Sequence, residues 1–584
     1  MILGQVSGSD LAQVALGREP ADLVIDNARL VNVYTGEVLE DQSVAVKGTR
    51  IAYVGSDVEE GIGPKTEVID ARGQVLIPGF IDGHIHLDWF CTLDEFLRAA
   101  IPHGTTAACT EMSSVADGLG YEGILEYLAA MEDQPAKIYG LAPAISLLNS
   151  ARYGGRAMIT IDQMERVAGV GEVYWPRVLE QDEEAERLLA KARACGKAIE
   201  GHTAGARGRK LAASVAGGLS SCHESITASQ TLERLRLGMY TMLREGSVRR
   251  DLTATATVAN LALDCRRLVL VSDSLWPNDL VRHGHMDHVV QRAIDLGCDP
   301  VKAVQMATLN AAEYFGMDGD IGGIAPGRCA DMQIVPELDT MRPRYVISDG
   351  RVVAKDGELL VEPRRSRYSA ALRHTVRLPR PLRPADLAVA APKGRREVAV
   401  RAIHLCGNVL TEERIVTLPV VDGMVLPDAA RGVLKAAVLD RQHNSGERAV
   451  AFATGCGMRK GALATSITFD GCKIAAIGAS DADLAGAINR LAELQGGLVL
   501  WADGGAVVEL PLPVSGTMSE RPIAELAARC DELLAACAEL GAELANPLLS
   551  LITITFTGVP ALRLRLGGLL DVRKGEIVSM FADA

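Results

Sequence analysis

Apolar and polar side chains alternate over residues 22–76, where β-branched residues are frequent and glycines separate the runs. Such alternation predicts short strands joined by tight turns. The same pattern returns at 330–338 and 344–359. Because these strand-rich segments flank a long stretch of different character, we predict one small composite β-sandwich domain built from residues 1–76 and 325–363.

Between these segments, strand-like and helix-like patterns alternate, with helical periodicity in stretches such as 182–196. Eight apolar runs within about two hundred residues predict an α/β fold, a (β/α)8 TIM-type barrel over residues 77–324. The runs lie at 79–87, 104–112, 137–146, 167–175, 197–203, 218–224, 239–247 and 268–274. An open, doubly wound sheet is the alternative, but no glycine-rich phosphate loop follows the first strand.

After the barrel region, the composition changes. Residues 364–387 are rich in Arg and Pro and are typical of a linker. Residues 388–584 then combine strand-like runs, such as 497–510, with a helical pattern at 523–540. We therefore predict a C-terminal α+β domain, which agrees with a chain of 584 residues being too long for one hydrophobic core.

Charge and composition narrow the function. The formal net charge is −14, which disfavours binding to a phosphate backbone, so we expect a small-molecule substrate and no nucleic acid. No run of about 18 apolar residues occurs, so we expect no membrane partner. The N-terminus lacks a signal-peptide pattern, and the twelve cysteines form no C-x-x-C pair. We therefore expect reduced cysteines and a cytoplasmic enzyme, and we expect a homo-oligomer.

The strongest chemical motif is His84-Ile85-His86, at the end of the first predicted barrel strand. Side chains two apart on a strand point to the same side, so these imidazoles can bind one divalent ion. Each of four other strands also ends in a possible ligand. A lone histidine is usually structural, but this set lies on the face where barrel enzymes place their active sites. The four further residues are Glu172, His202, His223 and Asp273.

These residues, with several longer stretches, resemble the amidohydrolase superfamily. Within it, the chain is similar to the adenine deaminases over nearly its whole length. The matching stretches are PGFIDGHIHL (78–87), PHGTT (102–106), GVGEV (169–173), EGHTAG (200–205), CHE (222–224), LREGS (243–247), GHMDHVVQRAI (284–294), MATLNAAEYFG (306–316), GGIAPGRCADM (322–332), GCGMRKGALATSITFD (455–470) and LPVSGTMS (512–519). The last two imply a C-terminal domain of the adenine deaminase type.

The resemblance implies roles for the six strand-end residues. His84 and His86 would hold one metal ion, and His202 and His223 a second. Glu172 would bridge them, and Asp273 would complete the first site and act as general base. One or two divalent ions per subunit are implied, of manganese, iron or zinc. The implied reaction is hydrolysis of a C–N bond of a small N-heterocycle, with adenine, water, hypoxanthine and ammonia as the family default.

Three stretches depart from the family pattern. Residues after the histidine pair read Leu87-Asp88-Trp89-Phe90, the second strand ends in Glu111-Met112-Ser113-Ser114, and a C-terminal stretch reads Phe469-Asp470-Gly471-Cys472-Lys473. We expect residues in these three stretches to lie where they can contact the substrate. The residues that we expect to bind substrate are Asp88, Trp89, Glu111, Ser113, Glu224 and His285.

Two other functions stay open. The same metal site can hydrolyse a cyclic amide or another heterocyclic amine, and a non-catalytic binding protein can share the fold. Loss of His84, His86 or Asp273 would favour the binding protein, and all three are present. Nucleobase deaminases with cysteine ligands carry H-x-E and P-C-x-x-C motifs, and neither occurs in this sequence.

Overall fold

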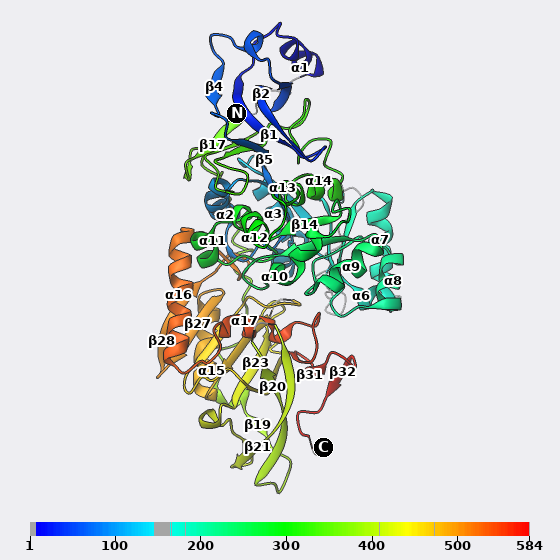
Figure 1. Ribbon diagram of the computed structural model, residues 1–584. Coiled ribbons are helices and arrows are strands. Elements are labelled where there is room, and N and C mark those ends of the chain that lie inside the picture. Colours follow the sequence, from blue (N-terminus) through cyan, green and yellow to red (C-terminus); the bar gives the residue numbers. More distant parts are fainter. Residues whose placement is uncertain are drawn as a thin grey trace.

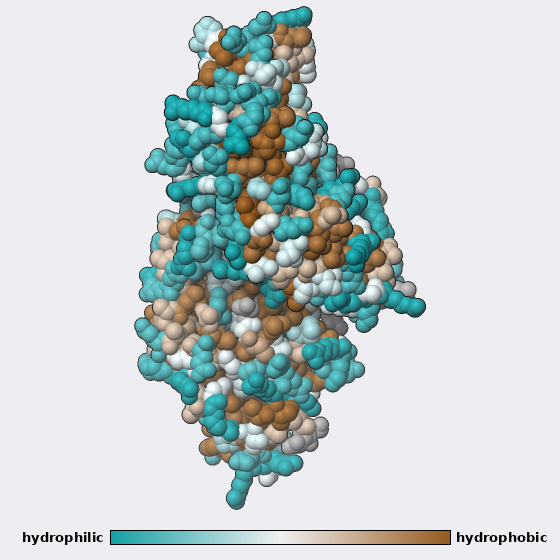
Figure 2. Space-filling view, viewed as in Figure 1, coloured by the Kyte–Doolittle hydropathy of each residue, from teal (hydrophilic) through white to brown (hydrophobic). Residues whose placement is uncertain are grey.

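A computed structural model describes residues 7–144, 164, 166–180, 183–407, 409–471 and 473–582. Three parts follow one another along an elongated molecule: a small β domain at one end, a barrel in the middle and an α+β domain at the other end (Figure 1). The visible face in Figure 2 carries hydrophilic residues over most of its area, with smaller hydrophobic patches between them. No helix among the described residues is long and apolar enough to cross a membrane.

The small β domain joins strands from two distant segments of the chain. Its described strands follow the order β18-β17-β16-β15-β5-β1-β2-β3, with β4 beside β1. The antiparallel pair β15 and β5 links the two segments, with Met332 opposite Pro78. The strands are β1 Leu23–Asn32, β2 Glu37–Lys47, β3 Arg50–Gly55, β4 Glu67–Asp70, β5 Val75–Pro78, β15 Met332–Val335, β16 Tyr345–Ser348, β17 Arg351–Lys355 and β18 Glu358–Leu359. Helix α1 (Gly8–Ala15) packs against them.

The central part is a barrel of parallel strands. Seven of its neighbouring pairs are joined by parallel ladders or backbone hydrogen bonds, including Ser220 N to Ile199 O at 2.9 Å. The ring closes where Asp273 N donates to His84 O at 2.9 Å and His86 N donates to Asp273 O at 2.7 Å. The strands are β6 Phe80–Ile85, β8 Thr105–Thr110, β9 Lys137–Ala142, β10 Gly169–Tyr174, β11 Ala198–His202, β12 Ser221–Cys222, β13 Tyr240–Arg244 and β14 Leu268–Val271. The predicted barrel is confirmed, because one of these strands lies in each of the eight apolar runs.

Helices cover the outside of the barrel because their apolar residues recur with helical spacing. In α12, Met286, Val289, Val290 and Ala293 form a buried stripe that packs against Leu268 and Leu270 of β14. The barrel helices are α2 Leu93–Ala100, α3 Ser113–Met131, α6 Trp175–Leu179, α7 Glu183–Ala194, α8 Gly208–Ala216, α9 Ala228–Arg236, α10 Leu252–Thr255, α11 Pro277–His283, α12 Met286–Asp295, α13 Pro300–Met306 and α14 Leu309–Phe315.

The C-terminal part is a mixed sheet with helices. Its described strands follow the order β19-β22-β21-β20-β24-β23-β26-β25-β27-β28. They are β19 Val389–Ala390, β20 Glu397–Leu405, β21 Thr411–Val421, β22 Met424–Val425, β23 Leu434–Asp440, β24 Arg448–Thr454, β25 Ala462–Thr465, β26 Lys473–Gly478, β27 Gly497–Ala502 and β28 Gly505–Pro511. The helices are α15 Asp481–Glu493, α16 Ile523–Glu539 and α17 Pro547–Ile552, and a small sheet contains β30 Leu562–Arg565, β31 Gly568–Asp571 and β32 Glu576–Val578.

The C-terminal part is attached directly to the carboxyl ends of the barrel strands. Strand β29 (Met518–Ser519) pairs in parallel with β7 (Phe90–Cys91), which follows the first barrel strand. The carboxylate of Glu95 accepts a hydrogen bond of 3.0 Å from Ile523 N at the start of α16. This contact places C-terminal residues over the barrel mouth. We propose the predicted ranges 1–76 with 325–363, 77–324 and 388–584 as the three domains.

Candidate metal centre and active site

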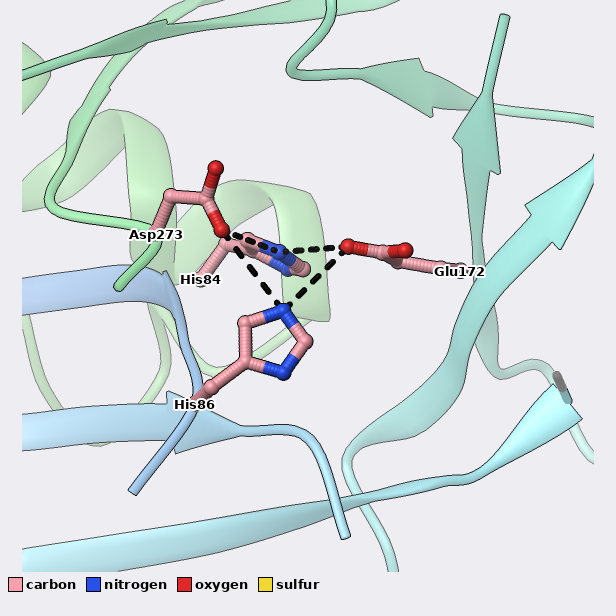
Figure 3. Close-up of side chains that lie close together, drawn as sticks. All are labelled: His84, His86, Glu172 and Asp273. Atoms are coloured by element: carbon pink, nitrogen blue, oxygen red, sulfur yellow. Dashed lines mark hydrogen bonds and ion pairs between the residues drawn. The ribbon is translucent and has the colours of Figure 1, made fainter. Parts of the chain in front are cut away.

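The carboxyl ends of the barrel strands bring together buried imidazole and carboxylate groups. His84 and His86, at the end of β6, face Glu172 of β10, and each Nε2 lies 3.3 Å from Glu172 Oε1 (Figure 3). Asp273, directly after β14, places Oδ1 3.8 Å from His84 Nε2 and 3.6 Å from His86 Nε2. These four residues, which come from three strands, form the first half of the site.

Two further histidines, from the next two strands, also contact Glu172. His202 at the end of β11 has Nδ1 3.5 Å from Glu172 Oε2, and His223 after β12 has Nε2 3.2 Å from Glu172 Oε1. The rings of His84 and His223 stack with centroids 4.2 Å apart. Glu172 therefore contacts all four histidines, and the six strand-end residues that the sequence singled out lie in one cluster.

The donor atoms of this cluster fit divalent metal ions. Across the residues that the structure describes, candidate ligand atoms lie within 4.8 Å of one another in four sets, and the two sets made only of the six strand-end residues share Glu172. Among the described residues, His84 Nε2, His223 Nδ1 and both nitrogens of His202 have no hydrogen-bond partner, although these atoms are buried. Buried polar atoms are normally satisfied, so these nitrogens need a partner of another kind. Nitrogen and carboxylate oxygen donors suit first-row divalent ions.

The electrostatics of the cluster favour positive charge. Burial lowers the pKa of His86 and His202, but the carboxylates of Glu172, Asp273 and Glu224 outweigh it and raise each pKa to about 9. Burial opposes the ionised form of Glu172 as well, yet the surrounding imidazoles hold its pKa well below the usual range. A divalent cation would supply the positive charge that these carboxylates attract.

Two further acidic residues, Glu200 and Glu111, form hydrogen bonds with candidate metal ligands and hold them in orientation. Glu200, on β11, has Oε2 2.7 Å from His84 Nδ1, which fixes the tautomer and directs Nε2 toward the cluster. Glu111 accepts a hydrogen bond of 2.7 Å from Glu172 N, and Ser113 Oγ donates to its other oxygen at 3.2 Å. Burial and the Glu172 charge raise the pKa of Glu111 to about 8. Glu111 and Ser113 thus support Glu172, and Glu200 is a site residue that the sequence reasoning missed.

A buried arginine completes the polar side of the site. Arg244 at the end of β13 lies 3.0 Å from Asp273 Oδ2 and also pairs with Glu224. Burial alone would raise the pKa of Glu224, but Arg244, His202 and His223 lower it to about 2. Glu224 is therefore an ionised carboxylate beside the cluster. The sequence reasoning did not single out Arg244, although it ends a strand of the barrel as the ligands do.

A cavity of about 20 Å³ lies beside the cluster, enough for about one water molecule. Both the barrel and the C-terminal part contribute to its wall. The lining residues are Glu172, His202, Glu224, Arg244, Val248, Arg249, Asp273, Val409, Phe469, Phe556 and Val559. The last four come from the C-terminal part, so this part closes the site.

The residues of the C-terminal part at the cavity, 469–470 and 556–557, form the closing segment, and a hydrogen-bond network holds it in place. Tyr174, the last residue of β10, donates from its hydroxyl to Asp470 Oδ1 at 2.8 Å. The other oxygen of Asp470 accepts a hydrogen bond of 2.6 Å from Thr557 N. Phe556 packs edge-on against the His202 ring, with centroids 5.5 Å apart. The sequence reasoning missed Tyr174 and Phe556, since neither carries a motif that marks it as part of a site.

Comparison with known proteins identifies the family. An amidohydrolase family model matches residues 75–353, and an adenine deaminase C-terminal domain model matches residues 408–576. An adenine deaminase of Moorella thermoacetica is 39% identical over 582 residues, covering 98% of this chain and 97% of the relative. One of Cenarchaeum symbiosum is 35% identical over 584 residues, covering 99% and 95%. The chain belongs to the adenine deaminase family of amidohydrolases.

This membership confirms the family and the enzyme class predicted from the sequence. The protein is a metal-dependent amidohydrolase of the adenine deaminase type. Among solved structures, molinate hydrolase aligns at 15% identity with a TM-score of 0.45, covering 58% of this chain and 95% of that chain.

The structure shows what the residues of the three stretches around the cluster contact. Asp88 accepts a hydrogen bond of 2.6 Å from Ser114 N at the start of α3. Trp89 donates to Ser114 Oγ at 2.9 Å and stacks on His86 with centroids 5.3 Å apart. Phe469 lies edge-on to Trp89 at 5.0 Å. Asp88 thus supports a helix end, Trp89 and Phe469 form an aromatic wall, and Cys472 lies outside the described residues.

His285 lies between the barrel strands and α12. Its Nδ1 is 2.7 Å from Thr105 Oγ1 and its Nε2 is 3.0 Å from Asp82 Oδ2. Asp82 also accepts a hydrogen bond from Ser272 N at 3.3 Å, next to Asp273. Both nitrogens of His285 are therefore engaged in a network behind Asp273, and His285 does not line the cavity formed by the described residues.

Proposed function

We propose that this enzyme deaminates adenine to hypoxanthine and ammonia. One observation carries the proposal: a buried cluster of four histidines with Glu172 and Asp273 occurs in a chain similar over nearly its full length to proteins named adenine deaminase. Hydrolysis of the exocyclic C–N bond consumes one water molecule and releases ammonia, so the site has to activate water and protonate the leaving nitrogen.

The cluster would hold one or two ions of manganese, iron or zinc per subunit. His84, His86, Glu172 and Asp273 form one ligand set, and Glu172, His202 and His223 form the other. A bound divalent ion supplies a Lewis acid, which lowers the pKa of coordinated water from about 15.7 to about 7. Glu200 and Glu111 hold the ligands His84 and Glu172 in orientation.

Asp273 would act as the general base and then as the general acid. Its Oδ1 points toward His84 and His86, which would hold the ion that activates water, while Oδ2 is held by Arg244. One water proton passes to the Asp273 carboxylate as the oxygen attacks the amine-bearing carbon. The same proton passes to the departing nitrogen as the C–N bond breaks, and ammonia leaves. Such positioned proton transfer typically contributes about 10² to 10⁴ in rate.

The walls of the cavity would contact the heterocycle once the C-terminal residues that close the site move outward, because the closed cavity has room for about one water molecule. Glu224 is ionised and faces the cavity, so it can accept a hydrogen bond from a ring N–H. Phe469 and Phe556, with centroids 4.6 Å apart, offer apolar surface to the ring. Five other residues would act without lining the cavity that the described residues form. Asp88 holds the start of α3, and Trp89 packs on His86. Ser113 and Glu111 hold the ligand Glu172, and His285 contacts Asp82 in the network next to Asp273.

We also propose that the enzyme acts in the cytoplasm as a homo-oligomer. The described cysteines, eleven of the chain's twelve, are all free thiols, which suits a reducing compartment. Size-exclusion chromatography with light scattering measures the oligomeric state, and a monomer at all concentrations would contradict that part of the proposal.

A substrate comparison tests the proposed reaction. Metal-reconstituted enzyme is incubated with adenine, other aminated purines and pterins, and cyclic amides, while ammonia and ring absorbance are measured together. We expect ammonia release with adenine in one-to-one proportion to hypoxanthine, and none from the His84→Ala variant. Turnover of a cyclic amide without ammonia, and none of adenine, would overturn the proposal in favour of ring opening.

A further inference from the structure

Arg244 is a cation surrounded by carboxylates at the edge of the candidate active site. Its side chain is 2% exposed. Nη1 lies 3.0 Å from Asp273 Oδ2 and also donates to Glu224, while Nη2 lies 2.8 Å from Asp251 Oδ2. One guanidinium therefore joins three carboxylates that come from different strand ends and loops. The rigid, planar guanidinium group can donate to several carboxylates at once, whereas the ammonium group of lysine is a single point charge.

This contact holds one of the two carboxylate oxygens of Asp273. Its backbone has φ = 63°, a left-handed conformation that non-glycine residues rarely adopt. The two carboxylate oxygens face different groups, because Oδ1 points to His84 and His86 and Oδ2 points to Arg244. A carboxylate without the guanidinium could rotate and exchange these oxygens. Arg244 holds Oδ2 while Ser274 Oγ donates to Oδ1 at 3.3 Å, so the two contacts together keep Oδ1 toward the metal ligands.

Glu224 is held by the same nitrogen. Because Arg244 Nη1 contacts both Glu224 and Asp273, the two carboxylates stand at a fixed separation across one hydrogen-bond donor. Asp251 secures the guanidinium from the other side, and Asp251 itself binds Arg249 at 3.0 Å. The guanidinium is therefore clamped between the site and the loop that follows β13.

We infer that Arg244 is a positioning residue that orients both the acid–base group Asp273 and the cavity carboxylate Glu224. This inference rests on the proposed function, in which Asp273 moves the proton and Glu224 contacts the heterocycle. Arg244 contributes by geometry and takes no part in proton transfer, so its loss separates the two carboxylates without removing a metal ligand.

Turnover measurements with two variants provide the first test. Arg244→Lys should lower kcat for adenine by about 10² or more, because an ammonium group cannot hold three carboxylates at once. Arg244→Ala should be slower still, and added guanidinium should recover at least tenfold of the lost rate while methylammonium should not. Metal content should stay at the wild-type value in both variants. Arg250→Ala, in the same loop but 58% exposed and paired with Asp279, is the matched control and should stay within threefold of wild type.

A spectroscopic test is independent of the substrate. In protein reconstituted with Co²⁺, the ligand-field absorption should change in Arg244→Ala, return toward the wild-type spectrum when guanidinium is added, and stay unchanged in Arg250→Ala. A wild-type enzyme that binds metal and does not turn over adenine would refute the proposed function, and the Co²⁺ spectra would still decide the role of Arg244. Unchanged spectra together with unchanged kcat, or an activity loss fully matched by metal loss without guanidinium rescue, would overturn the inference.

Discussion

The hydroxyl of Tyr174 ties the barrel to the segment that closes the site, so Tyr174→Phe tests how firmly the site is closed. The hydroxyl donates to Asp470 at 2.8 Å, and burial with the Asp470 charge raises the pKa of Tyr174 well above its usual value, so the phenol stays protonated. A hydrogen bond to a charged group contributes about 1.5–3 kcal/mol. Phenylalanine keeps the ring that packs on His202 and removes only this bond.

The size of the effect follows from this free energy. The six proposed metal ligands are at most 6% exposed, so a chelator reaches bound ions only when the closing segment opens. If opening becomes easier by about 1.5–3 kcal/mol, the open population rises about 10- to 150-fold, since about 1.4 kcal/mol corresponds to a factor of ten. We therefore expect metal extraction by a chelator to accelerate by about that factor.

The assay follows loss of metal from reconstituted enzyme at a fixed chelator concentration. The control is Tyr345→Phe in β16 of the small β domain, which removes a tyrosine hydroxyl away from the barrel mouth and should leave the extraction rate unchanged. An extraction rate within twofold of wild type for Tyr174→Phe would refute the reasoning, because the bond to Asp470 would then not hold the site closed.

Three other substitutions follow from the same geometry. Asp273→Asn should leave the fold intact and lower kcat by about 10² or more, and turnover within a few-fold of wild type would show that another group moves the proton. Glu200→Gln should weaken metal binding about 10- to 100-fold, measured by metal titration, because the carboxyl group that accepts from His84 Nδ1 is lost. Val248 belongs to the cavity wall that the barrel and the C-terminal part share, so Val248→Ala should loosen this closure and speed metal extraction as Tyr174→Phe does; an unchanged extraction rate would contradict this role.

The barrel could be predicted from the sequence because its strands are short apolar runs separated by helices with clear periodicity. The ligands could be predicted for a related reason: a histidine or carboxylate directly after an apolar run stands out against its neighbours. Asp273 after β14 and His202 at the end of β11 are examples. Their convergence then follows from closing the barrel, since all strand ends meet on one face.

Other site residues could be identified only from the way that the folded chain packs. Glu200 stands two residues before His202 on the same strand, so the two-residue period of a strand places both side chains on the same face. Arg244 and Tyr174 end strands as the ligands do, but residue type alone does not reveal that they face Asp273 and Asp470. Phe556 lies far from the barrel in sequence, and it reaches His202 only because the C-terminal part packs on the barrel.

Reconstitution of the metal-free enzyme is the most direct test of the central claim that the buried histidine and carboxylate cluster holds the ions needed for hydrolysis. Metal-free protein is titrated with Mn²⁺, Fe²⁺ or Zn²⁺ while bound metal and ammonia release from adenine are measured in the same samples. We expect ammonia release to appear in proportion to bound metal and to saturate at one or two equivalents per subunit. Undiminished ammonia release from metal-free protein, or two bound equivalents in a His84→Ala, His202→Ala double variant, would contradict the account.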